Sequence, residues 1–114
     1  MKPKIVGLNN CEVVEHPKHR KFFVRTMITS ADNPSMSFHR GTVEVGGAIL
    51  PHTHEKETET YYILSGKSEG TMGNDKGTYT FGSLFMAPPG VLHGLENIGD
   101  EPVEIVSVFT PPIK

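Results

Sequence analysis

Four side chains that can bind a metal ion lie in two short stretches of the chain. The first stretch, GGAILPHTHEKETETYYILSG, contains His52, His54 and Glu59, and the second, GSLFMAPPGVLHGLEN, contains His93. Neutral imidazoles and a carboxylate are good ligands for manganese, iron, cobalt, nickel, copper or zinc, and they bind in their unprotonated forms. We therefore expect these four residues to hold one divalent transition-metal ion.

The alternation of side chains along a β-strand explains how these residues could converge. His52 and His54 are two positions apart, so in a strand they would share one face. Glu59 has the opposite parity, but the polar segment EKET before it is suited to a turn. Such a turn would place Glu59 on the inner face of the next strand, together with Tyr61 and Ile63. The PPG turn before His93 could swing a further strand back against the first.

The composition predicts that short strands position these residues. The 114 residues include 12 Gly and 9 Pro, which would interrupt long helices but are tolerated in the turns between strands. We expect a turn at Gly46, a hairpin loop over 73–77, and strands over residues 4–6, 21–29, 37–45, 48–54, 60–64, 67–72, 78–81, 83–87, 92–96 and 103–109. Many short strands at even spacing favour an antiparallel barrel, which hides its strand edges, formed by a single domain over residues 1–114.

Both stretches resemble the two sequence motifs of the cupin superfamily. Residues 46–66 match the first motif and residues 82–97 match the second, and every defined position of both patterns is filled. In this chain the matching positions are Gly46, His52, His54, Glu59, Gly66, Gly82, Pro88, Gly90, His93 and Asn97. The resemblance implies an all-β jelly-roll barrel (a double-stranded β-helix), a metal ion held by the three histidines and the glutamate, and a homodimer. It implies no single reaction, because cupins carry out many.

Three further residues are candidates for a catalytic role. If Glu44 faces solvent, alternation places His39 inside the barrel, whereas a bulge in that strand would exchange it for Arg40. His39 could act as a general base near neutral pH, and Arg40 could clamp a carboxylate. Tyr61 shares the expected face of Glu59 and could donate a hydrogen bond to a metal-bound ligand. For each of the three, a plain role in the barrel wall is the alternative.

Charge and composition argue against several classes of partner. Lys and Arg number 11 against 13 Asp and Glu, so no excess of positive charge attracts nucleic acid or a membrane surface. No stretch approaches the ~20 apolar residues that cross a bilayer, and the N-terminus lacks the apolar core of a secretory signal. Cys11 is the single cysteine, which fits the reducing cytoplasm. The segment HPKHRK over residues 16–21 could form an anion or metal patch, but we expect a solvated loop.

These observations lead us to expect a cytoplasmic enzyme acting on a small polar metabolite with a carboxylate, hydroxy-keto or catechol-like group. The ion would serve as a Lewis acid or as the place where dioxygen and substrate meet. A dioxygenase-type oxidoreductase is favoured over an isomerase or lyase. The alternative is a noncatalytic module that binds or senses a small ligand, but sensing cupins usually carry a second domain for which 114 residues leave no room. Tyr62 and Leu64, expected to face outward, are candidates for a homodimer contact.

Overall fold

The protein has an antiparallel all-β fold, as the sequence predicts. The computed structural model describes residues 1–113. In this part of the chain the strands are β1 (Val14–Glu15), β2 (Arg20–Ile28), β3 (Ser37–His52), β4 (Thr58–Ser65), β5 (Ser68–Met72), β6 (Asp75–Tyr79), β7 (Leu84–Ala87), β8 (His93–Asn97) and β9 (Val103–Thr110). The helical structure here is one 3-10 turn, η1 (Leu8–Asn10), so no helix among these residues is long enough to cross a membrane.

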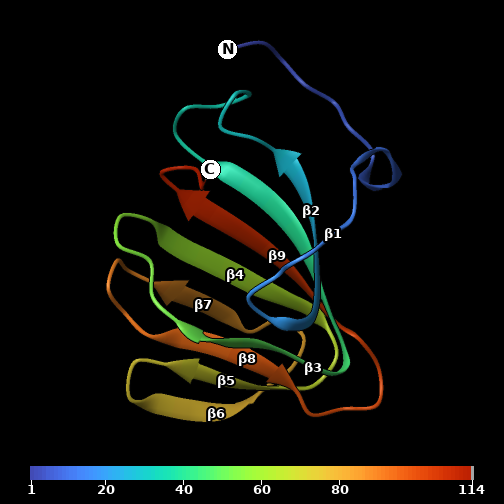
Figure 1. The fold of residues 1–114 in the computed structure, drawn as a ribbon, viewed down its shortest axis with the longest axis vertical. Helices are drawn as coiled ribbons and strands as arrows, with labels where there is room; N and C mark the ends of the chain where they lie inside the picture. Colours follow the sequence, from blue (N-terminus) through green and yellow to red (C-terminus); the bar gives the residue numbers. More distant parts are fainter. Residues whose placement is uncertain (114) are drawn as a thin grey trace.

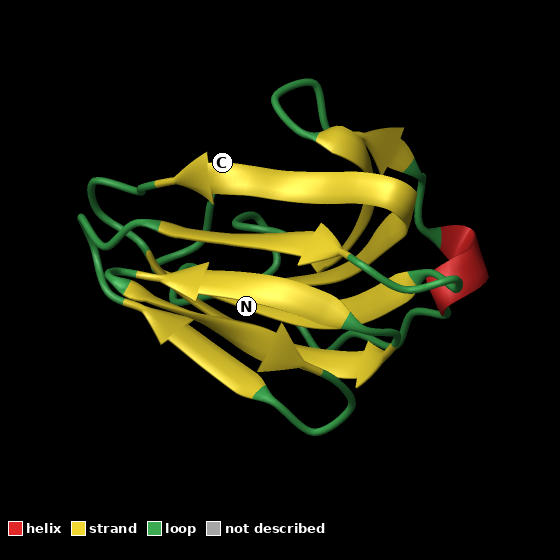
Figure 2. Ribbon diagram, turned by 90° about the horizontal axis from the view of Figure 1, so that it is seen from below, coloured by secondary structure: helices red, strands yellow, loops and turns green. Residues whose placement is uncertain are grey.

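All of these strands join one sheet that curls into a barrel-like jelly roll. The strand order is β6-β5-β8-β3-β9-β4-β7. Outside this order, β2 pairs with β3, and β1 pairs with β2. Figure 1 shows β2, the first half of β3, β9 and β4 across the upper part of the molecule and the second half of β3 with β7, β8, β5 and β6 across the lower part. In Figure 2, seen from below, the strands wrap around a common interior and η1 lies at the periphery.

The long strand β3 connects the two parts of the barrel. Its first half, through Val43, pairs with β2 on one side and β9 on the other, whereas its second half pairs with β8 from Ala48 onward. The expected turn at Gly46 is therefore wrong, because the chain bends there without leaving the strand. Gly46 adopts a positive φ of 81°, which glycine reaches without steric cost. Gly47 passes so close to the Arg20 carbonyl that a side chain there would clash.

Two other strand boundaries differ from expectation. Residues 4–6 form no strand, and the N-terminal segment instead joins the sheet at β1, by two residue pairs with β2. The hairpin after β5 is tighter than the expected loop over 73–77, because Met72 pairs directly with Asp75. Gly73 has a positive φ of 60°, as the first position of a two-residue hairpin loop favours. The remaining predicted strands agree with the structure within a few residues.

The core follows the period of two expected of strands with one buried face. Along β4, Glu59, Tyr61 and Ile63 are buried while the residues between them are partly exposed, as predicted. Buried apolar residues fill the interior, namely Phe22, Val43, Ile49, Tyr61, Ile63, Phe85, Leu95, Val103 and Ile105. Glu59 and His93 are buried polar residues at the edge of this apolar packing.

We predict that the two glycines that begin and end the first motif differ in their tolerance of a side chain. Both have a positive φ, 81° for Gly46 and 89° for Gly66. A Cβ at Gly66 would lie 2.7 Å from the Pro102 carbonyl oxygen, whereas the nearest atom at Gly46 is the Lys21 ammonium at 3.8 Å. Gly46→Ala should cost about 1–2 kcal/mol of the free energy of unfolding, from backbone conformation alone. Gly66→Ala should cost at least about 1 kcal/mol more because of the backbone clash.

Urea unfolding of the two variants checks this prediction. Equal losses for both would mean that the chain around Pro102 shifts freely, contrary to the packing seen.

Candidate metal centre

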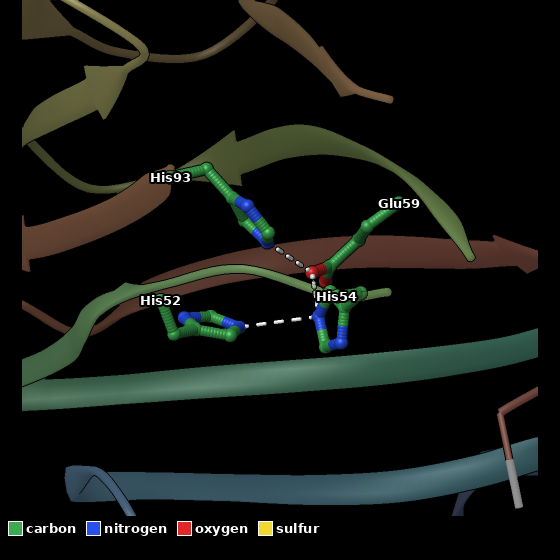
Figure 3. Close-up of side chains that lie close together, drawn as sticks. All are labelled: His52, His54, Glu59 and His93. Atoms are coloured by element: carbon green, nitrogen blue, oxygen red, sulfur yellow. Dashed lines mark hydrogen bonds and ion pairs between the residues drawn. The ribbon is translucent and has the colours of Figure 1, made fainter. Parts of the chain in front are cut away.

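The structure brings together the four residues predicted as metal ligands. His52 is the last residue of β3, His54 lies just after it, Glu59 is in β4, and His93 opens β8. His52 and His93 are paired across the β3–β8 ladder. One ligand atom from each residue lies within 4.8 Å of the other three. Figure 3 shows the four side chains pointing toward one another.

The separations between neighbouring ligand atoms suit a single transition-metal ion. The Nε2 atoms of His52 and His54 are 3.2 Å apart, His93 Nε2 is 2.9 Å from Glu59 Oε1, and His54 Nε2 is 3.3 Å from the same oxygen. Nitrogen and oxygen ligands bind such ions at about 2.0–2.2 Å, which places adjacent ligand atoms about 3 Å apart. The donor set therefore fits a metal ion in both chemistry and spacing.

Backbone carbonyls fix the tautomers of two of these histidines. His52 Nδ1 lies 2.8 Å from the Leu50 carbonyl oxygen, and His93 Nδ1 lies 3.0 Å from the Val91 carbonyl oxygen. A carbonyl oxygen only accepts, so each Nδ1 carries the proton and each neutral ring turns the lone pair of Nε2 toward the cluster. Such an outer hydrogen bond is the usual way in which a ligating histidine is oriented.

Glu59 is buried and held from two sides. The side chain is in contact with His93 and His54 through Oε1, and its Oε2 accepts a hydrogen bond of 2.7 Å from the Ser107 hydroxyl. Burial alone would raise its pKa, but the hydrogen bonds from His54, His93 and Ser107 outweigh burial and hold the pKa well below its usual range. The residue is therefore a carboxylate at neutral pH, with one oxygen directed at the cluster and the other bound to β9.

The neighbouring histidines titrate in opposite directions. Burial lowers the pKa of His52. Burial would also lower the pKa of His93, but its bond to Glu59 and the Val91 carbonyl outweigh this effect and raise it. A raised pKa means that, without another cation, a proton on His93 neutralises Glu59. Metal binding must displace that proton, because a ligating imidazole is neutral.

The cluster lies on the wall of a cavity of about 650 Å³. Strands β2, β3 and β9 line it from inside the barrel, and the segment around β1 and residue Ile113 near the C-terminus contribute to its wall. This volume is sufficient for a small molecule in contact with the cluster. His52, His54 and Glu59 all border the same space, so a ligand in the cavity would meet the cluster directly.

Of the three predicted catalytic candidates, the structure places only His39 in this cavity. His39 is 6% exposed; its Nδ1 lies 3.0 Å from the Thr26 hydroxyl and its Nε2 lies 2.9 Å from the Ser37 hydroxyl. Burial lowers its pKa. Arg40 points to the opposite face of β3, where it pairs with Glu104 at 3.4 Å. His39, and not Arg40, therefore faces the interior, so β3 has no bulge here that would turn Arg40 inward.

Tyr61 is buried beside the cluster but does not border the cavity. Its ring stacks on Phe85 with centroids 4.7 Å apart and lies 6.5 Å from the ring of His93. Burial, followed by the charge of Glu59, raises the pKa of its phenol, so the group is neutral. Its hydroxyl has no hydrogen-bond partner among the described residues.

Three residues near the cluster were not predicted from the sequence to belong to the site. Ser107 fixes the carboxylate of Glu59 but belongs to neither motif. His16 and His19, expected in a solvated loop, instead border the cavity, and the ring of His19 lies 4.8 Å from that of His52. His19 Nδ1 accepts a hydrogen bond from the Leu50 amide. Burial and the neighbouring His16 and His52 lower the pKa of His19 to about 4.

Comparison with known proteins agrees with this fold and these motifs. The sequence profile of the cupin domain matches residues 39–109. An uncharacterised protein of Methanocaldococcus jannaschii is 37% identical over 76 residues, which cover 67% of this chain and 61% of that protein. The Arabidopsis germin-like protein subfamily 2 member 2 is 36% identical over 80 residues. The match covers 66% of this chain but only 36% of that longer protein.

Solved structures share the fold at low sequence identity. A predicted oxalate decarboxylase from Thermotoga maritima superposes with a TM-score of 0.84 at 21% identity, covering 95% of this chain and 99% of the other. Ectoine synthase from P. lautus gives a TM-score of 0.84 at 16% identity, covering 98% and 80%. These likenesses concern the fold. Since the cupin profile matches more than half of the sequence, the chain belongs to the cupin domain family.

Proposed function

We propose that this cupin is a metal-dependent enzyme that acts on a small molecule bound in the cavity. The observation that carries the proposal is the convergence of four ligand atoms from His52, His54, Glu59 and His93, of which the first three residues border that cavity. A bound divalent ion would polarise a substrate oxygen or bring substrate and dioxygen together. The fold around it would occupy residues 1–114 as one domain.

The protein's own residues would orient the site and move protons. The carbonyls of Leu50 and Val91 hold His52 and His93 with Nε2 directed at the cluster. Ser107 holds the carboxylate of Glu59. His39 is the candidate general base that we retain, because its ring nitrogens exchange hydrogen bonds with Thr26 and Ser37, and Thr26 itself borders the cavity. A proton could pass between a bound molecule and His39 through the Thr26 hydroxyl.

We favour a dioxygenase-type oxidoreductase, with isomerase or lyase chemistry as the second candidate. Three imidazoles and one carboxylate are compatible with all of these reactions. The second candidate draws support from proteins of similar fold, among them an ectoine synthase and a predicted oxalate decarboxylase. A noncatalytic role as a small-ligand binder is the remaining alternative, and binding without turnover would distinguish it.

We further propose that the protein acts in the cytoplasm as a homodimer. Tyr62 and Leu64 lie on the outer face of β4, and the paired strand β7 exposes Leu84 and Met86 by 62% and 58%. Apolar side chains gathered on one face of an edge strand suit a contact with a second copy. The thiol of Cys11 is free, which is compatible with a reducing compartment.

We predict that Glu59→Gln greatly weakens metal binding. The substitution keeps the shape of the side chain but removes the charge that faces His54 and His93. Loss of a residue that hydrogen-bonds to a metal ligand already lowers metal affinity by about 10–100-fold. Loss of the charged ligand itself should therefore lower it by at least about 100-fold. Titration of the metal-free protein with Co(II) or Zn(II) against a competing chelator measures the effect.

Glu12→Gln is the matched control, because Glu12 borders the same cavity but lies outside the cluster. An equal loss of affinity in both variants would show that the field of the cavity, and not ligation by Glu59, determines binding.

We predict that Ser107→Ala weakens metal binding by about 10–100-fold, the usual effect of losing an outer hydrogen bond to a ligand. The variant leaves Glu59 Oε2 buried without its partner, so the carboxylate is less well oriented. Ser68→Ala is the control, since Ser68 is also buried and hydrogen-bonded, to the Tyr79 carbonyl at 3.0 Å, in the β5–β6 hairpin. Metal affinity unchanged in Ser107→Ala would rule out this supporting role.

The proposed activity is tested on protein loaded with Fe(II) or Mn(II). We expect oxygen consumption, or conversion of a member of a keto-acid and phenol panel, and we expect Thr26→Val to lower the rate with little effect on metal affinity. Metal analysis of the protein as purified should show one ion per chain. Turnover that is absent with every metal and substrate, despite tight ligand binding, would favour the noncatalytic alternative.

A further inference from the structure

We infer that the cavity takes a chelating ligand that carries an apolar body and no more than one negative charge, such as a catechol. The inference rests on the metal site proposed above and narrows the expectation of a small polar metabolite. It excludes phosphorylated and polycarboxylic molecules as the preferred ligands. Three features of the cavity support it: the charges on its wall, the apolar character of that wall, and the pairing of its inner polar groups.

The first feature is the absence of a permanent cation. Among residues 1–113, no lysine or arginine borders the cavity, whereas the carboxylates of Glu12 and Glu59 both do. A divalent ion combined with the carboxylate of Glu59 leaves one positive charge, which a singly charged chelator balances. A second or third negative charge on the ligand would enter a partly enclosed space beside Glu12 with no positive partner, which is costly.

Two arginines of β2 and β3 are held on the outer face of the sheet. Arg25 and Arg40 are paired across β2 and β3, one position from the inward-facing pair Thr26 and His39. Arg25 donates hydrogen bonds to the Leu8 and Cys11 carbonyls, at 3.3 and 2.8 Å. Both arginines border a second, smaller cavity on that outer face. Strand alternation thus removes both guanidinium groups from the space that a ligand would enter.

The second feature is an apolar wall. Phe22 and Val24 of β2, Ile49 of β3 and Phe109 of β9 face the cavity, and Ile113 adds to it near the C-terminus. The ring of Phe109 makes edge contacts with both His39 and His54, at centroid distances of 5.4 and 5.1 Å. An apolar ligand body of ring size would replace water against these side chains, and burial of apolar surface is favourable.

The third feature is that the inner polar groups around His39 already have partners. His39 uses both ring nitrogens, with Thr26 and Ser37. Ser37 also accepts a hydrogen bond from the Ile113 amide. A ligand with several hydroxyl or carboxyl groups would have to break these bonds to form its own, whereas an apolar body leaves them intact. In this inner part of the cavity, the polar contact open to a ligand is therefore the cluster of metal-ligand candidates.

The test compares three probes with the same chelating group. The full-length protein is loaded with Co(II) without oxygen, and binding of catechol, tert-butylcatechol and a disulfonated catechol is followed by the visible absorption of the metal. Each affinity is divided by the affinity of the same probe for free Co(II). After this correction, tert-butylcatechol should bind at least as tightly as catechol, and the disulfonated probe at least about tenfold more weakly because its added charges have no partner. Ultrafiltration checks that the metal stays with the protein.

A pair of adjacent valines provides the matched variants. Val14 borders the inner cavity and Val13 the outer one, and both are exposed, by 52% and 45%, so both positions should tolerate a lysine. Val14→Lys should improve the relative affinity of the disulfonated probe by about fivefold, the effect of one close charge pair in watery surroundings. Val13→Lys should leave it unchanged.

The outcomes separate this inference from the proposed function. Failure of the protein to bind Co(II) would overturn the metal site and the inference with it. Co(II) binding combined with equal or tighter corrected affinity for the disulfonated probe would overturn the inference alone. Failure of catechol to change the spectrum of the Co(II) protein would do the same. The same improvement in both lysine variants would show that overall charge, and not the cavity wall, sets the preference.

Discussion

The electrostatics of the site depend on lone pairs that converge on one point and need a cation between them. Backbone carbonyls fix protons of His52 and His93 on Nδ1, so the Nε2 lone pair of His93 faces the carboxylate of Glu59 and that of His52 faces Nε2 of His54. Two acceptors at 2.9 Å repel each other unless a positive charge joins them. A proton on His93 is one solution, which is why its pKa rises, and a metal ion is the other. With neutral imidazoles the cluster is thus a preformed arrangement with one negative charge, which either a proton or a divalent ion can balance.

The geometry of the barrel makes this convergence possible. The ligands come from the end of β3, from the segment after it, from β4 and from β8, and β9 lies between β3 and β4 in the sheet. Ser107 is paired with Tyr61 and is therefore a diagonal neighbour of Glu59 on the same face. Diagonal neighbours are close enough for side-chain contact. The bend at Gly46 lets one strand serve both parts of the barrel, and the expected turn would have separated them.

The sequence predicted those parts of the site that depend on local pattern. Parity along β4 placed Glu59 and Tyr61 on the inner face, in agreement with the structure. Parity along β3 placed His39 inside unless a bulge put Arg40 there, and the structure has His39 on the buried face. The four metal-ligand candidates came from motif spacing, and the structure brings their ligand atoms together. The role of Ser107 could not be predicted in this way, because it depends on which strand lies beside β4, and that pairing joins residues far apart in the chain.

The same limit explains the errors in the N-terminal segment. Residues 4–6 have the composition of a strand but no neighbouring strand with which to pair, so they stay outside the sheet. HPKHRK looks like a solvated loop by its charge, yet His19 packs against His52 and accepts a hydrogen bond from the Leu50 amide. Local polarity describes what a segment prefers in water. Its final position depends on the surface that the rest of the fold offers to it.

The candidate metal ligands and much of the cavity wall are drawn from different parts of the sequence. His52, His54, Glu59 and His93 all lie within residues 39–109, which match the cupin profile. Much of the cavity wall comes from outside that range, from Glu12, Val14 and the histidines before β2, from the inner face of β2, and from Ile113. Substitutions in these wall residues would therefore change the charge and size of the cavity without changing the four residues of the cluster. The match to the cupin profile thus covers the four-residue cluster but not much of the cavity wall, so the kind of molecule that the cavity could take has to be inferred from its own wall residues.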